Sequence, residues 1–105
     1  MDQIYDVIII GGGAAATAAA LTLKNRGKSA LVICNKPEPS SLWKAEAITN
    51  YPGLPAMSGK EMCELFQRQL EESGAVIVNG RALSALPMED SFGVAVGSDF
   101  YMGAL

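Results

Sequence analysis

The sequence predicts an α/β fold in which a short parallel sheet is followed by a β-meander. Three observations lead to this prediction. A run of β-branched residues ends in three consecutive glycines, and a segment rich in alanine and leucine leads from there to a second β-branched run. The C-terminal part of the chain instead contains short strand-like segments separated by turn signals. With 105 residues, the chain is long enough for one hydrophobic core.

The first unit is a strand, a turn, a helix and a second strand. Residues 4–10 read Ile-Tyr-Asp-Val-Ile-Ile-Ile, which is typical of a parallel strand buried on both faces. Residues 14–26 are rich in strong helix formers, and Gly27 follows at the position of a C-terminal cap. Residues 29–34 form a second buried strand. This order predicts a βαβ unit with a right-handed crossover.

The middle of the chain contains a long connection and a second helix. Residues 35–57 include four of the five prolines and lack periodicity, so we expect a mostly irregular loop, and loops of this length are usually functional. Ser58 and Glu61 match a capping box, in which the glutamate reaches back to the start of a helix. This helix carries an apolar stripe and stops at Gly74, and residues 75–78 form a third buried strand.

The C-terminal part alternates weakly between apolar and polar residues. It predicts a β-meander with strands at residues 81–88, 92–96 and 100–105. The pattern stops at Leu105 without a polar tail, and a sheet of three parallel strands keeps open edges. We therefore expect residues 1–105 to form an incomplete domain of a longer protein.

Composition argues against several classes of function. The net charge is -3 and the eight basic residues are scattered, which argues against a nucleic-acid surface. Histidine is absent and Cys34 lies far from Cys63, so a Cys/His zinc site is excluded and a reducing, cytoplasmic compartment is expected. The apolar residues 4–23 lack the basic flank of a signal peptide and are too rich in glycine for a membrane span. We expect neither a metal nor a membrane partner.

The glycine turn matches a known fingerprint. Gly11-x-Gly13-x-x-Ala16 fits the dinucleotide-binding pattern, and it stands between a strand and a helix as that motif requires. Gly11 permits the tight turn, and Gly13 lets a phosphate approach the amides and positive dipole of the helix N-terminus. Ala16 is small, so helix and strand can pack closely. The residues expected to hold the pyrophosphate are Gly11, Gly12, Gly13, Ala14, Ala15 and Ala16.

The second strand ends without the acidic residue that this fingerprint usually places there. That carboxylate, about 20 residues after the glycines, accepts hydrogen bonds from the ribose hydroxyls. Here the strand ends in Cys34-Asn35-Lys36. Asn35 can still bond to ribose as donor or acceptor, and Lys36 can meet a phosphate. The change weakens an interpretation as an NAD site and leaves the affinity for FAD open.

These residues together resemble the FAD-binding N-terminal part of the thioredoxin reductase family, which belongs to the pyridine nucleotide-disulfide oxidoreductases. The resemblance extends over nearly the whole chain. It includes the opening segment 5–13 and the second strand at residues 30–33. The segment Thr49-Asn50-Tyr51-Pro52-Gly53, followed by Ser58-Gly59, is similar to the family's ENYPG…SG segment.

The resemblance implies a Rossmann-like fold with FAD across the glycine turn and its ribose near Asn35. The flavin would lie against residues 43–51, where Asn50 matches a family residue that hydrogen-bonds the cofactor. Backbone near Arg81 would flank the adenine. In relatives, NADPH reduces the flavin, which passes electrons to a cysteine pair, and the full-length proteins are dimers. The NADPH-binding domain and the cysteine pair are both missing from this chain.

Two departures from the family pattern matter. Ala14 and Ala16 replace a proline and the last glycine of the fingerprint. The family's GGQL stretch, which contacts the flavin, is replaced by Ser40-Ser41-Leu42-Trp43. Trp43 either stacks on the flavin or anchors its own loop. Cys34 and Cys63 are interpreted as small core residues.

The leading hypothesis is the FAD-binding portion of a thioredoxin reductase-like oxidoreductase, without catalytic residues of its own and incomplete as an enzyme. One alternative is a scaffold that keeps the fold and has lost the cofactor, which the missing ribose carboxylate and the altered loop favour. Another alternative is a small NAD-binding domain. Without histidine or an acid near a nucleophile, hydrolase chemistry has no support.

Overall fold

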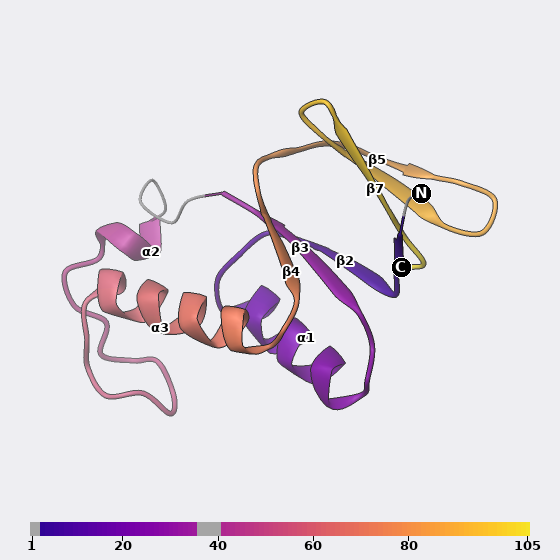
Figure 1. Ribbon diagram of the computed structural model, residues 1–105. Helices are drawn as coiled ribbons and strands as arrows, with labels where there is room; N and C mark the ends of the chain where they lie inside the picture. Colours follow the sequence, from indigo (N-terminus) through magenta and orange to yellow (C-terminus); the bar gives the residue numbers. More distant parts are fainter. Residues whose placement is uncertain (1–2, 36–40) are drawn as a thin grey trace.

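The computed structural model describes residues 3–35 and 41–105 and arranges them in three layers (Figure 1). Two helices cover one face of a parallel three-stranded sheet, and a second, four-stranded sheet covers the other face. The elements are β1 (Ile4–Tyr5), β2 (Val7–Ile10), α1 (Ala14–Asn25), β3 (Ala30–Cys34), α2 (Ser41–Lys44), α3 (Gly59–Glu72), β4 (Val76–Asn79), β5 (Ala82–Pro87), β6 (Phe92–Val96) and β7 (Asp99–Gly103).

The parallel sheet has the order β2-β3-β4, so β3 is its central strand. All five residues of β3 are buried, and they point alternately to the two sides of the sheet. Val32 and Cys34 pack toward α1 and α3, together with Ala20 and Leu70. Leu31 and Ile33 pack against β6 of the four-stranded sheet. The predicted α/β fold with a short parallel sheet is confirmed.

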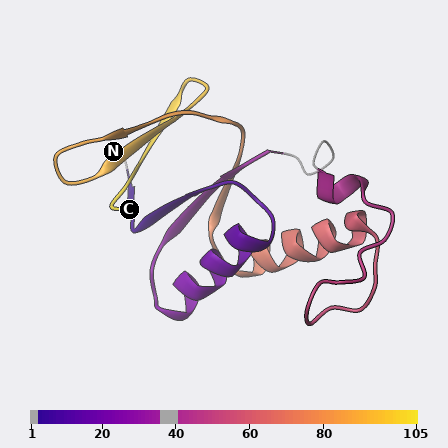
Figure 2. The same cartoon turned by 180° about the vertical axis from the view of Figure 1, so that it is seen from behind.

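Both long helices lie on the same face of the parallel sheet, as the view from behind also shows (Figure 2). Helix α1 ends in a Schellman motif, because the Gly27 amide donates to the Lys24 carbonyl at 3.1 Å and the Lys28 amide donates to the Leu23 carbonyl at 2.9 Å. Gly27 has φ 69, the conformation for which glycine was predicted there. At the start of α3, Ser58 Oγ accepts from the Glu61 amide at 3.1 Å, and the Glu61 carboxylate accepts from the Ser58 hydroxyl. The predicted capping signals are confirmed.

The prediction of one continuous strand over residues 4–10 was wrong. The chain bends at Asp6, where the carboxylate accepts from the Ser29 amide at 2.7 Å and from the Ser29 hydroxyl at 3.1 Å. Before the bend, β1 pairs in parallel with β7. After it, β2 pairs with β3. The predicted burial on both faces also fails for this segment, because Ile10 of the edge strand β2 is 55% exposed. The strand that is buried on both faces is β3.

This bend gives a prediction about pH. The hydrogen bonds from the Ser29 amide and hydroxyl hold the pKa of Asp6 below its ordinary value of 3.8. A carboxyl whose pKa is lower in the folded state stabilises the fold above the ordinary value, and this contribution is lost as the pH falls below it. We expect the melting temperature of the wild type to fall more steeply below about pH 4 than that of Asp6→Asn. Parallel melting curves in acid would contradict the assignment.

The predicted β-meander is confirmed, with slightly different strand ends. Strands β5, β6 and β7 are joined by antiparallel pairing, and β1 adds a parallel strand at the β7 edge. The long connection is more ordered than expected. Within its described residues, α2 forms a short helix and Ile48 bridges Met57. Between these bridging residues the chain makes a wide loop that packs Tyr51 near Phe66.

Candidate functional site

The three glycines form the connection between β2 and α1. Gly11 has φ 122 and Gly13 has φ 97, values that residues with a side chain rarely adopt. A Cβ at either position would meet no atom within 4 Å, so the requirement for glycine is conformational and the space beyond the turn is open. The Gly11 amide donates to the Ile33 carbonyl at 2.8 Å, which fixes the turn against β3.

The N-terminus of α1 is arranged to receive an anion. Its N-cap is Gly13, which supplies no side-chain cap, and its first turn contains no acidic residue. The amides of Ala14, Ala15 and Ala16 belong to that first turn, where α-helical amides lack an acceptor within the helix. In contrast, α3 satisfies its own first turn through Ser58 and carries an acidic residue there. The N-terminus of α1 is therefore suited to bind an anion, whereas the N-terminus of α3 is already capped and carries a negative charge.

A cavity of about 290 Å³ opens in front of this turn. The glycine turn and the end of β3 form one side of it, and α3 forms the other. Its lining includes Gly13, Asn35, Leu42, Cys63 and Gln67. Thr17 ties the two helices together below the cavity. Its hydroxyl oxygen lies 2.7 Å from the Gly13 carbonyl oxygen and 3.5 Å from that of Phe66.

A second hollow of about 260 Å³ adjoins the first on the other side of Gly11. It is lined by the end of β3 and by the connection from β4 to β5, including Gly80 and Arg81. The Gly80 amide donates to the Cys34 carbonyl at 3.0 Å, which holds this connection beside β3. Asn35 lines both hollows. An elongated ligand that crosses the turn would therefore pass Asn35.

Comparison with known proteins identifies the family. The family described as "FAD binding domain" matches residues 6–89 of the chain. The chain belongs to this family. The family description names FAD as the cofactor, and the matched residues include the glycine turn.

Relatives of this FAD-binding domain chain include thioredoxin reductases. The thioredoxin reductase of Aquifex aeolicus (strain VF5) is 37% identical over 84 residues, which are 79% of this chain and 26% of the reductase. A thioredoxin reductase from Gloeobacter violaceus superposes with a TM-score of 0.86 at 28% identity, covering 95% of this chain and 32% of that one. A ferredoxin-flavin thioredoxin reductase from Clostridium acetobutylicum gives 0.86 at 32% identity, covering 97% and 36%. The chain therefore spans between 26% and 36% of the length of these relatives.

The residues of this FAD-binding domain chain fit a diphosphate. The open space at Gly11 and Gly13 is where a Cβ would otherwise project, and the first-turn amides of α1 have no side-chain cap. Ala16 is only 6% exposed, in agreement with the prediction that a small residue lets α1 pack on the sheet. The replacement of the family's last glycine by alanine is therefore accommodated in the core.

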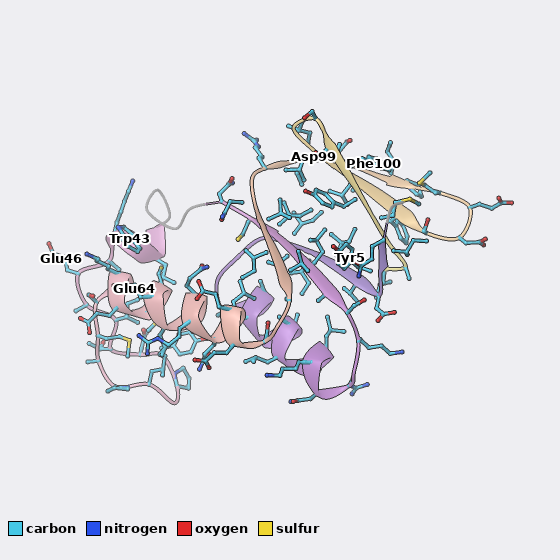
Figure 3. All side chains as sticks on the ribbon, in the orientation of Figure 1. Tyr5, Trp43, Glu46, Glu64, Asp99 and Phe100 are labelled. Atoms are coloured by element: carbon cyan, nitrogen blue, oxygen red, sulfur yellow. The ribbon has the colours of Figure 1, made fainter. Side chains whose placement is uncertain are left out.

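The other predicted cofactor residues lie outside the glycine turn, on several different elements. Asn35 lines both hollows and Arg81 lines the second one, and Lys36 lies outside the described residues. Trp43 sits on α2, at the end of the molecule away from Phe100 and the β-meander (Figure 3). Its ring lies 5.7 Å from Lys60 Nζ, and its neighbour Leu42 lines the cavity. Asn50 is exposed on the loop between α2 and α3.

Both cysteines are buried in the wall of the cavity, and no disulfide joins them. Cys34 packs with Val32 and Leu70, which confirms its interpretation as a small core residue, and burial raises the pKa of its thiol. Within residues 3–35 and 41–105, no group of three or more His, Cys, Asp or Glu could hold a metal ion. In the same part of the chain, no helix has the length and apolar character needed to cross a membrane.

Sequence reasoning missed the far wall of the cavity. Phe66 and Leu70 belong to the apolar stripe of this helix and are buried, but both also line the cavity together with Gln67. The one signal in the sequence was the polar residue Gln67 beside the apolar stripe. Whether Gln67 faces the cavity depends on how α3 packs against α1, which the sequence does not specify.

Proposed function

We propose that this chain binds FAD through its diphosphate at the Gly11–Ala16 turn and forms the FAD-binding part of a thioredoxin reductase-like oxidoreductase. The observation that supports this proposal most directly is the N-terminus of α1, which has no side-chain cap and no acidic residue and whose N-cap Gly13 lines the 290 Å³ cavity. Amides without an intrahelical partner and the positive end of the helix dipole both favour an anion at this position.

The proposed placement of FAD follows the two hollows. The diphosphate rests on the amides of Gly12 to Ala16. The adenosine ribose lies beside Asn35, and the adenine enters the hollow at Gly80 and Arg81. The flavin extends toward α2, which carries Trp43, and toward the loop that carries Asn50. Within this arrangement Asn35 hydrogen-bonds the ribose hydroxyls, since an amide offers both a donor and an acceptor.

The role of this chain is to bind and orient the cofactor. FAD supplies the electron-transfer chemistry when it is bound. The glycine turn fixes the diphosphate, and the apolar lining of the cavity, including Leu42 and Phe66, excludes water from its surroundings. We assign residues 1–105 to a partial Rossmann-like domain, so the nicotinamide-binding domain belongs to another part of a complete reductase. The chain alone is therefore expected not to turn over NADPH.

Absorption spectroscopy tests the proposed function. The purified chain, mixed with FAD and freed of excess cofactor, is expected to retain a flavin absorption band, and titration is expected to give saturable quenching of flavin fluorescence. A colourless protein that binds no FAD would instead support the scaffold hypothesis. A change in NADH fluorescence without FAD binding would support a small NAD-binding domain.

We further propose that the complete protein is a dimer in a reducing, cytoplasmic compartment. Both cysteines are buried and no disulfide joins them, and structural disulfides are rare in that environment. The dimer follows from the resemblance to thioredoxin reductases.

A further inference from the structure

The glycine fingerprint describes only one side of the cavity. The other side consists of residues from α3, a helix that begins 48 positions after Gly11 at Gly59. None of the described lining residues carries a charge, so any ligand there meets neutral donors and apolar surface. The polar amide and hydroxyl side chains in the lining are Thr17, Asn35 and Gln67, and Thr17 already bonds to the backbone of α1.

Gln67 is the polar side chain that α3 contributes to this cavity. Its Nε2 donates to Glu71 Oε1 at 3.3 Å, one turn further along the helix. Because a carboxylate only accepts hydrogen bonds, this contact orients the amide with its nitrogen toward Glu71. A primary amide carries two N–H donors and this bond uses one of them. The second N–H is thus available to an oxygen atom in the cavity.

We propose that Gln67 donates a hydrogen bond to a phosphate or ribose oxygen of the bound cofactor, so that α3 forms a second wall of the FAD site. This inference rests on the proposed function. The glycine turn holds the diphosphate from one side through backbone amides, and Gln67 positions it from the other. Cys63, one turn before Gln67 on α3, lies in the same wall and is covered when the cofactor is present.

A charge-matched pair of variants tests this role. Gln67→Glu removes the donor and adds a negative charge that faces the diphosphate. Gln69→Glu adds the same charge on the same helix, but Gln69 lines a different hollow beside Leu21 and Leu54. We expect Gln67→Glu to weaken FAD binding by about tenfold or more, and Gln69→Glu to change it less than about twofold. Gln67→Leu, which only removes the donor, is expected to fall between these two.

The titration follows flavin fluorescence at constant salt, and thermal unfolding verifies that each variant is folded. Equal FAD affinities of the two glutamate variants, with the wild type binding FAD, would overturn the role of Gln67 and leave the proposed function intact. A wild type that binds no FAD would overturn both.

Thiol alkylation supplies a second measurement that needs no variant. Iodoacetamide labelling followed by peptide mass analysis separates the modification of Cys63 from that of Cys34. We expect saturating FAD to slow the labelling of Cys63 by several-fold. An unchanged labelling rate of Cys63 in the FAD-bound protein would show that the cofactor does not cover α3. It would overturn the proposal that α3 forms a second wall of the FAD site.

Discussion

Gly13→Val is expected to abolish FAD binding, with a loss of affinity of about a hundredfold or more. Gly13 is the N-cap of α1, and the position of its missing Cβ faces space that is open to 4 Å. A valine would fill this space in front of the first-turn amides and keep the diphosphate away from them. Hydrogen bonds to a charged group are each worth about 1.5–3 kcal/mol, so the loss of two corresponds to at least this change. Fluorescence titration with FAD measures it.

The control for this variant is Gly97→Val. Gly97 has φ 59, and a Cβ there would also meet nothing within 4 Å, but it lies in the turn between β6 and β7. Both valines introduce a side chain where φ is positive, at a cost of about 1–3 kcal/mol in stability. Only Gly13→Val is expected to lose FAD. If both variants bind FAD equally well, the diphosphate does not rest on the α1 N-terminus.

The features that sequence reasoning predicted correctly depend on neighbours in the chain. Gly27 ends α1 because a left-handed residue is needed at that position, and Ser58 begins α3 because its hydroxyl caps an amide three residues on. The glycine turn has the same local character. Its residues specify their own backbone conformation, and this conformation exposes the amides of α1.

The features that could not be predicted depend on residues far apart in the sequence. The strand over residues 4–10 is divided because Asp6 binds Ser29, and because β1 finds a partner in β7 near the end of the chain. Hydrophobic pattern alone gives no sign of either contact. The same holds for the candidate site, since Gln67 reaches the cavity only through the packing of α3 beside α1.

Gly59→Ala is expected to destabilise the fold by about 3 kcal/mol and to weaken FAD binding as a consequence. Gly59 is the first residue of α3, and a Cβ there would fall on the carbonyl group of Leu42, which is backbone and cannot rotate away. The Gly59 amide also donates to the Ala45 carbonyl at 2.8 Å. These contacts hold α2 against the first turn of α3. Since Leu42 lines the cavity, displacement of α2 would open its wall.

The direction of the stability change in Gly59→Ala distinguishes the two possible arrangements of α2. In an unobstructed helix, alanine in place of glycine stabilises by roughly 0.5–1 kcal/mol, so a gain in stability for Gly59→Ala would show that α2 does not pack on α3. Gly93→Ala serves as the control, because a Cβ there would meet the ring of Phe100, a half-exposed side chain on the surface of the β-meander. That ring can move aside, whereas the Leu42 carbonyl cannot. In chemical denaturation, Gly59→Ala should therefore be clearly less stable than Gly93→Ala, and FAD binding should be weakened only in Gly59→Ala.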